Sequence, residues 1–305
     1  MTRRPRSLAA AAGLLVLLPL APAAAQAGFD SVRVRVVPVA GGVSMLVGRG
    51  GNIGVSAGDD GVFLVDDQYA PLTDRIRAAV ATLSPRPIRF VLNTHWHGDH
   101  TGGNENLGGA GVLIVAHDNV RLRMSTEQFI ERINQRFPPS PAAALPVVTF
   151  NDAVTFHVNG DEVHAFHVPP AHTDGDALVH FRRANVLHMG DVYFNGIYPF
   201  VDLSSGGSLR GVIAACDRAL ALANEATKVI PGHGELSNRA ELAAYRDMLV
   251  DAVGRIAAAI AAGKTLEQLQ AERPLADFDA TWGRGFITPE VFLAATYREL
   301  SAAPR

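Results

Sequence analysis

The order of the segments along the chain predicts an α/β protein in which sheets and helices form layers. In each half, short apolar runs come first, polar segments rich in histidine and aspartate follow some of these runs, and helical patterns come last. Sheets and amphipathic helices each have an apolar side that must be covered, so this order indicates sheets packed between helices. The 305 residues suffice for one large domain or two small ones.

The N-terminal segment is typical of a secretory signal peptide, which we expect to span residues 1–27. A basic segment, residues 2–6, precedes an apolar run, residues 8–20, and small residues up to Ala27 offer a cleavage site. The apolar run is too short for a membrane span. We therefore expect a periplasmic or secreted protein without a stable membrane anchor, in which residues 28–305 form a single domain.

Charge and cysteine content narrow the possible partners. Cleavage of the predicted signal peptide would change the formal net charge from −3 to −6. The sequence after the predicted signal peptide has no basic run, so we expect a small-molecule substrate and no nucleic acid as partner. The single cysteine, Cys216, lies in an apolar helical pattern and is expected to be a small buried side chain. Nothing in the sequence indicates an oligomeric state.

The chain up to residue 92 predicts strands around one helix. Gly41-Gly42 and Gly58 to Gly61 separate short apolar runs, which indicates hairpins. Apolar residues then recur at helical spacing until a proline-rich segment ends the pattern. The expected elements are strands at residues 32–39, 43–47, 52–56, 62–65 and 88–92, and a helix at residues 71–83.

The segment from His95 to His100 has the clearest chemical signal. It places three histidines and Asp99 within six residues, directly after the expected strand at 88–92. Imidazole and carboxylate groups bind zinc, and imidazole also suits iron and copper. In a nearly extended segment His95 and His97 project to the same side and can bind one ion, while Asp99 and His100 can reach a second. The alternative is a structural cluster without a metal.

The middle of the chain predicts a strand, a helix and a proline-rich stretch. Residues 112–116 form the expected strand, and residues 118–133 form the expected helix, with Phe129, Ile130 and Ile133 on a partial apolar face. The proline-rich stretch at residues 137–146 ends this helix. That stretch would be either a flexible rim near the histidine segment or a plain connector.

The second half repeats the order of strands followed by helices. Asn159-Gly160 indicates a hairpin, and Ser208 is expected to cap a helix. The expected strands are at residues 153–158, 162–168, 177–181, 185–189 and 227–230, and the expected helices are at residues 208–223, 238–262, 265–272 and 289–300.

The pattern His-x-His-x-Asp-His after a strand resembles the metallo-β-lactamase superfamily of hydrolases. Three further segments resemble the family's remaining motifs in the correct order, at residues 171–176, 188–191 and 231–234. The resemblance covers essentially the whole chain after the signal peptide. It implies an αββα four-layer sandwich of two mixed β-sheets flanked by helices, with the metal site at one edge.

The resemblance also implies a site for two Zn²⁺ ions, with iron as the alternative metal. The implied ligands are His95, His97 and His172 for the first ion and Asp99, His100 and His233 for the second, with Asp191 between the two ions. Asp99 and Asp191 would in addition be catalytic, since they can orient a water and pass a proton to the leaving group. Considered alone, His172 would be a turn residue and Asp191 a helix cap.

Further positions near these motifs have two interpretations each. Asp66 resembles the family aspartate that supports the metal-binding histidines, and the alternative is a cap for the next helix. Asn195, Tyr198 and Phe200 follow the Asp191 segment and would either line the substrate pocket or pack within their loop.

The predicted site favours hydrolysis. Zinc lowers the pKa of a bound water to about 7, so that hydroxide is available to attack a carbonyl at neutral pH. The β-lactamase branches of the family differ from this chain, because they have cysteine or serine in place of Asp191, and one has lysine where this chain has Phe194. We therefore predict an exported dinuclear-zinc hydrolase of a small ester, thioester or lactone. The alternatives are a β-lactamase, and an iron-dependent oxygenase or metal-binding protein of the same fold.

Overall fold

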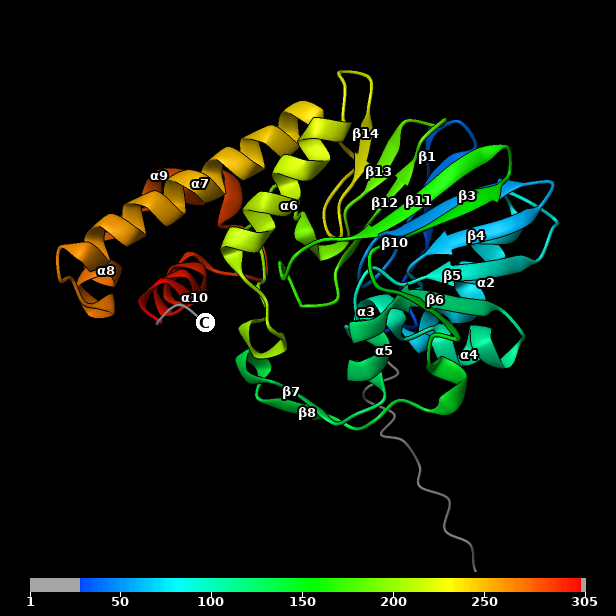
Figure 1. Cartoon of the computed structure of the whole chain (residues 1–305), viewed down its shortest axis with the longest axis horizontal. Helices are drawn as coiled ribbons and strands as arrows, with labels where there is room; N and C mark the ends of the chain where they lie inside the picture. Colours follow the sequence, from blue (N-terminus) through cyan, green and yellow to red (C-terminus); the bar gives the residue numbers. More distant parts are fainter. Residues whose placement is uncertain (1–27, 303–305) are drawn as a thin grey trace, which may run out of the picture.

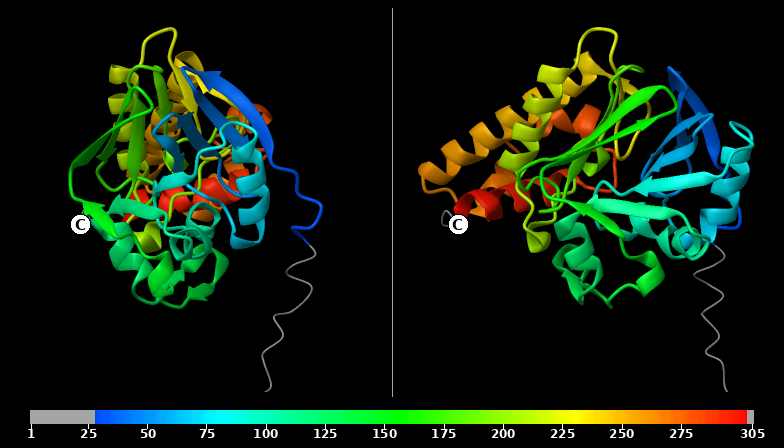
Figure 2. Two further views of the ribbon diagram at one scale, coloured as in Figure 1. Left: turned by 90° about the vertical axis from the view of Figure 1, so that its right-hand side faces the viewer. Right: turned by 45° about the vertical axis from the view of Figure 1, so that its right-hand side comes forward.

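The computed structural model describes residues 28–302, which form four layers (Figures 1 and 2). Two β-sheets face each other, and helices cover the outer face of each sheet. The predicted αββα sandwich of two mixed sheets is therefore confirmed. The predicted signal peptide, residues 1–27, lies outside the described residues.

The first sheet has the strand order β1-β2-β3-β4-β5-β6-β9. Strands β1 to β4 pair antiparallel, whereas β4, β5, β6 and β9 run parallel to one another. The parallel strands end at the same edge, where the metal-binding segments begin. The strands are β1 (Arg35–Ala40), β2 (Val43–Val47), β3 (Ile53–Gly58), β4 (Gly61–Val65), β5 (Ile88–Leu92), β6 (Leu113–His117) and β9 (Val148–Phe150).

The second sheet has the strand order β10-β11-β12-β13-β14-β15. Only β13 and β14 pair in parallel, and all other neighbours are antiparallel. The strands are β10 (Ala153–Val158), β11 (Asp161–His167), β12 (Ala177–Phe181), β13 (Val186–His188), β14 (Lys228–Ile230) and β15 (Ser237–Asn238).

Apolar cores between and outside the two sheets hold the layers together. The inner faces of the two sheets meet in a core that includes Phe63, Val65 and Phe181. Helices α2 and α4 close a second core on the outer face of the first sheet, and the C-terminal helices close a third on the second sheet. The helices are α2 (Thr73–Ala81), α3 (Gly98–Thr101), α4 (Asn104–Gly109), α5 (Asp118–Met124), α6 (Leu209–Leu222), α7 (Arg239–Ala261), α8 (Leu266–Glu272), α9 (Ala276–Trp282) and α10 (Pro289–Ser301).

Local sequence signals explain several helix starts. The Ser208 hydroxyl accepts a hydrogen bond from the Gly211 backbone N–H, so Ser208 caps α6 as predicted. Thr265 forms a capping box at α8, and Pro289 occupies the first turn of α10. Cys216 is fully buried in α6, as expected.

The predicted helix at residues 118–133 is wrong. Helix α5 ends at Met124, and β7 (Gln128–Ile130) then pairs with β8 (Gln135–Phe137) in a separate hairpin, which Figure 1 shows at the edge of the molecule. The reason is that Asn134 adopts a left-handed conformation and turns the chain back. Of the three residues expected on an apolar helix face, Phe129 and Ile133 are exposed and only Ile130 is buried.

The other predicted elements are present, with ends that differ by a few residues. Helices α3, α4 and α9 and strands β9 and β15 were not predicted, because each is short. The proline-rich stretch contains a short 3₁₀ turn, Ala142–Ala144, that packs beside α4. Across residues 28–302, no helix combines the length and apolar character required to cross a bilayer.

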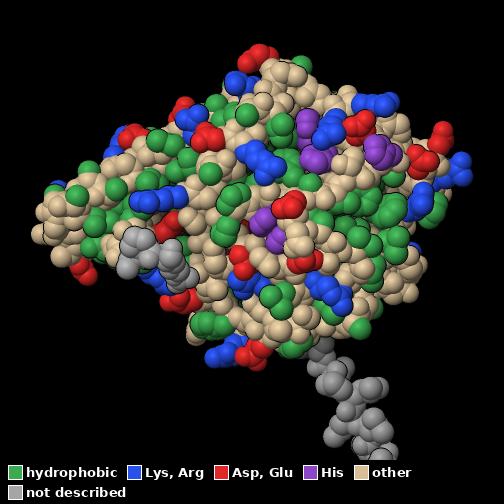
Figure 3. Space-filling view, viewed as in Figure 1, with side chains coloured by type: hydrophobic (Ala, Val, Ile, Leu, Met, Phe, Trp, Pro, Cys, Tyr) green, Lys and Arg blue, Asp and Glu red, His purple; other side chains and the backbone are tan. Residues whose placement is uncertain are grey.

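Charged side chains are mixed over the surface drawn in Figure 3. On this face, basic and acidic side chains of the described residues are interspersed.

Candidate metal centre

The candidate metal centre lies where strands of both sheets end. Strand β5 leads into the segment with His95 and His97, and the short helix α3 carries Asp99 and His100. In the second sheet, β13 leads to Asp191 and its parallel neighbour β14 leads to the turn with His233. His172 lies between β11 and β12. Because parallel strands end at one edge, residues far apart in sequence converge there.

All seven predicted ligands come together in two adjacent groups. The first group contains only buried residues, and in the second group only His100 is buried while its two companions are partly exposed. Within each group the potential ligand atoms lie within 4.8 Å of one another. The groups are His95, His97, His172 and Asp191, and Asp99, His100 and His233.

The Asp191 carboxylate lies between the two groups. Its Oδ1 atom is 3.0 Å from Nε2 of His100 and 3.3 Å from Nε2 of His233. Its Oδ2 atom is 3.6 Å from Nε2 of His172 and 3.9 Å from Nε2 of His95. One oxygen therefore faces each group, as a bridging carboxylate requires.

Three buried polar atoms at the centre fit a metal. Among the described residues, Nε2 of His95, Nε2 of His100 and Oδ1 of Asp191 have no hydrogen-bond partner. The close approach of Asp191 to His100 thus lacks the geometry of a hydrogen bond. Burial of such atoms without a partner is costly, and a cation between them would satisfy all three. The donor set of imidazole and carboxylate is the one that zinc and iron accept.

Asp66 contacts His100 on the side of the ring that faces away from the centre. Its Oδ2 atom lies 2.8 Å from Nδ1 of His100 and 2.7 Å from the Thr94 hydroxyl, and its Oδ1 accepts from the Thr94 backbone N–H. Nδ1 of His100 is thereby engaged, so Nε2 faces the centre. Of the two interpretations of Asp66, the contact with His100 is the one present.

Two further contacts orient the histidines of the first group. Asp202 Oδ2 lies 3.0 Å from Nε2 of His97, and the Phe200 carbonyl lies 2.7 Å from Nδ1 of His172. Nδ1 of His97 and Nε2 of His172 are therefore the nitrogens that face the centre, 2.8 Å apart. Partners of this kind fix both the tautomer and the ring orientation of a metal-binding histidine.

Protonation in the first group suits a metal. Burial lowers the pKa of His172 to about 4, and burial together with neighbouring histidines lowers the pKa of His95 well below its usual value. Both imidazoles are therefore neutral at pH 7, as metal ligands must be.

The second group attracts positive charge. Burial would raise the pKa values of Asp99 and Asp191, but adjacent histidines outweigh it, so that the pKa of Asp99 is about 2 and that of Asp191 is well below its usual value. Burial would lower the pKa of His233, but Asp191 and Asp99 raise it to about 9. In the absence of an ion, protons on the histidines supply the positive charge that the carboxylates require.

Glycines allow the backbone to approach the centre closely. A side chain at Gly232 would collide with Asp191, and one at Gly51 would collide with the ring of His100. Both positions thus need glycine for space. By contrast, Gly98 within the histidine segment has open space around it.

The chain matches the profile of a known family over most of the region that builds this centre. Residues 46–233, more than half of the chain, match the family described as the metallo-beta-lactamase superfamily. The chain belongs to this superfamily. The predicted resemblance is therefore confirmed.

The curated relatives align with only part of this chain. The 2,4-dinitroanisole O-demethylase subunit alpha of Nocardioides sp. (strain JS1661) is 27% identical over 46% of this chain and 40% of its own length. The acyl-coenzyme A thioesterase MBLAC2 of Bos taurus is 24% identical over 52% of this chain and 60% of its own length. The chain thus spans about half the length of the curated relatives it matches.

Solved structures of low identity share the superfamily fold. A metallo-beta-lactamase from Pontibacter korlensis is 20% identical with a TM-score of 0.57, over 71% of this chain and 99% of that one. A double mutant of the sec-alkyl sulfatase PisA1 is 18% identical with a TM-score of 0.67, over 87% of this chain and 50% of that one. At these identities the likeness concerns the fold alone.

The predicted pocket residues have different positions. Tyr198 is fully buried, its hydroxyl donates to Asp279, and its ring stacks on Phe292, so its assignment to the pocket is wrong. Asn195 donates to the Glu235 carbonyl and stabilises the turn that carries His233. Sequence order placed Tyr198 near the site, but its side chain turns toward the C-terminal helices.

Aromatic rings instead surround the centre. Phe200 stacks on His97 with ring centroids 5.8 Å apart, and Phe194 stacks on His233 at 5.2 Å. Phe286 contacts both Phe194 and His233 from the loop before α10. Neither Phe286 nor Asp202 carries a sequence signal, because both reach the centre only through the tertiary fold.

Proposed function

We propose that this chain is an exported hydrolase that uses two zinc ions to cleave a small ester, thioester or lactone. The observation that carries the proposal is the pair of adjacent ligand groups with Asp191 between them. Two bound zinc ions would supply an acidified water and a Lewis acid for the carbonyl oxygen. Superfamily membership supports metal-dependent hydrolysis in general.

Asp99 is suited to hold the attacking water. Its carboxylate is partly exposed, and its Oδ2 atom lies 3.3 Å from Nε2 of His233 and 3.7 Å from Nε2 of His100. Because its pKa is about 2, it is anionic at neutral pH and accepts hydrogen bonds. Asp191 is more deeply buried, so its main role would be to hold the two ligand groups at a fixed separation.

The surroundings favour an ester or thioester over a β-lactam. Phe194 occupies the position at which one β-lactamase branch has a lysine, and it is fully buried and stacked on His233. An apolar ring there cannot pair with a drug carboxylate. The name of one relative, an acyl-coenzyme A thioesterase, also supports thioester cleavage.

The proposal of export rests on the N-terminal sequence alone. Residues 1–27 combine a basic segment, a short apolar run and small residues before the predicted cleavage site. N-terminal sequencing of the protein from the periplasm of its expression host would test this. An N-terminus near Gly28 is expected, whereas an intact Met1 in the cytoplasm would contradict export.

A substrate panel tests the proposed reaction. The zinc-loaded protein would be assayed with p-nitrophenyl acetate, acetyl-coenzyme A, γ-butyrolactone and a chromogenic cephalosporin. We expect chelator-sensitive turnover of at least one of the first three compounds. Turnover of the cephalosporin alone would favour the β-lactamase alternative, and activity only with iron and dioxygen would favour an oxygenase.

A further inference from the structure

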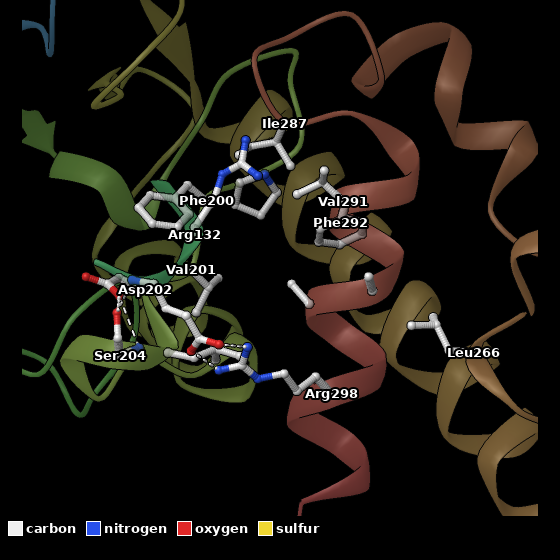
Figure 4. A pocket seen from close by; sticks show the side chains of 15 residues that line it. Arg132, Phe200, Val201, Asp202, Ser204, Leu266, Ile287, Val291, Phe292 and Arg298 are labelled. Atoms are coloured by element: carbon white, nitrogen blue, oxygen red, sulfur yellow. Dashed lines mark hydrogen bonds and ion pairs between the residues drawn. The ribbon is translucent and has the colours of Figure 1, made fainter. Parts of the chain in front are cut away.

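A cavity of about 350 Å³ lies beside the metal centre (Figure 4). The segment that contains Phe200 and Val201 forms one wall, and helix α10 with the loop before it forms the other. The volume is within the range of small-molecule sites. None of the catalytic roles proposed above uses this cavity.

The walls of the cavity are mainly apolar. Phe200 and Val201 face Ile287, Val291 and Phe292 across it. The small side chains of Ala294 and Ala295 on α10 leave the space between the walls open. An apolar chain would lose its contact with water there, which stabilises binding in proportion to the buried area.

The cavity and the metal centre share a wall. The Phe200 ring stacks on His97 at an interplanar angle of 18°, and the Phe200 carbonyl contacts His172. Asp202, another wall residue, contacts His97. Two of the three histidines of the first group are thus held by residues that line the cavity.

One cation lies at this shared wall. The Arg132 guanidinium lies 5.9 Å from the centre of the Phe200 ring and donates to the Phe286 carbonyl. Within residues 28–302, Arg132 makes no ion pair, whereas Arg298 at the other end of the cavity pairs with Glu131. Arg132 is therefore the cavity's positive charge without an ion-pair partner on the side of the candidate metal centre.

We propose that this cavity binds the apolar acyl chain of the substrate and that Arg132 attracts its carboxylate product. The inference rests on the proposed hydrolase function and narrows the substrate to medium-chain acyl esters or thioesters. In the reaction the oxygen of water bonds to the acyl carbon, the bond to the leaving oxygen or sulfur breaks, one proton of the water passes to the leaving group, and the other is released to solvent. The product is a fatty carboxylate with its chain in the cavity.

Calorimetric titration of the zinc-loaded protein with octanoate tests chain binding without turnover. Ala295→Phe fills the cavity from α10, whereas Ala258→Phe makes the same change at an exposed position of α7. We expect octanoate to bind wild type and Ala258→Phe equally and Ala295→Phe about tenfold more weakly, because chain burial is lost. Equal affinity in all three proteins would overturn the proposal.

Two further comparisons separate the contributions to binding. Acetate should bind far more weakly than octanoate, since it has no chain to bury, and equal affinities would overturn the role of the cavity. Arg132→Gln should weaken octanoate and leave octanol unchanged, and unchanged octanoate affinity would overturn the role of Arg132. If Ala295→Phe does not fold, as judged by its melting temperature, Val291→Phe fills the same cavity.

Hydrolysis of p-nitrophenyl acetate and p-nitrophenyl octanoate distinguishes failure of this proposal from failure of the proposed function. Ala295→Phe should raise the KM for the octanoyl ester more than for the acetyl ester. Ester turnover with no such difference would contradict the cavity proposal alone. Cavity-dependent octanoate binding without turnover of any ester or thioester would contradict the hydrolase proposal alone.

Discussion

At the scale of single residues, the centre depends on side chains that hold other side chains. Each of His97, His100 and His172 has one nitrogen engaged by Asp202, Asp66 or the Phe200 carbonyl, and the other nitrogen faces the centre. Because these groups are buried, water cannot replace a lost partner, so the loss of any one contact would disturb the orientation of its imidazole ring.

Asp202→Ala should weaken metal binding at the first group. His97 would lose the acceptor of its Nε2 hydrogen bond, and the loss of such a partner lowers metal affinity by about 10–100-fold. Competition with a chromogenic chelator measures this affinity. Asp59→Ala, at an exposed turn, is the matched control and should bind as wild type. Wild-type affinity in Asp202→Ala would contradict the assigned role of Asp202.

Asp191→Ala should lower occupancy of the second group more than that of the first. The second group keeps only partly exposed Asp99 and His233 beside His100, whereas the first keeps three buried histidines. Metal analysis by mass spectrometry at limiting zinc measures the change. Equal retention of both ions would show that Asp191 does not lie between them.

Residue-level prediction succeeded where ligands belong to short motifs. The segment from His95 to His100 and the turn of His233 are recognisable from their residue composition. The structure brings all seven predicted ligands together. Asp202 and Phe286 were not predictable, because no local pattern marks a loop residue whose role depends on what packs against it. The prediction that Tyr198 lines the pocket was wrong for the same reason, because no local pattern shows that its side chain packs against the C-terminal helices.

At the scale of elements, strand ends and tight loops bring the backbone close to the ligands. The loop between β2 and β3 passes so near His100 that Gly51 has no room for a side chain. The sequence indicated strands on both sides of this loop, but it did not indicate which glycine lies against a ligand. Similarly, the apolar spacing at 118–133 suggested a helix, whereas the turn at Asn134 produces the β7–β8 hairpin.

Gly51→Ala should displace His100 and weaken the second group. The added methyl would collide with the imidazole ring, so the ring or the loop must move. Gly98→Ala is the matched control, because the same methyl meets open space although Gly98 lies within the histidine segment itself. The zinc content per chain is measured for both variants. Equal zinc content in Gly51→Ala and Gly98→Ala would contradict the close approach at Gly51.

At the scale of the whole molecule, the metal centre joins the two sheets. His95, His97, Asp99 and His100 follow the first sheet, whereas His172, Asp191 and His233 belong to segments of the second. The layered fold was predictable because its apolar periodicity extends over the whole chain. The cavity beside α10 was not, since it arises from the packing of the C-terminal helices against the segment with Phe200.

Zinc should therefore stabilise the fold as a whole. A ligand at one hundred times its Kd contributes about 2.7 kcal/mol to the free energy of unfolding. We expect the melting temperature to fall by several degrees when a chelator removes the metal and to recover when zinc is added back. An unchanged melting temperature after verified metal removal would contradict a centre that joins the sheets.

The most direct test of the dinuclear hydrolase is zinc stoichiometry measured together with chelator-reversible ester or thioester turnover. The account predicts two zinc ions per chain, loss of activity on chelation and recovery on adding zinc, with His97→Ala retaining the fold but not the activity. Turnover that persists in the metal-free protein, or wild-type metal content and activity in His97→Ala, would contradict it.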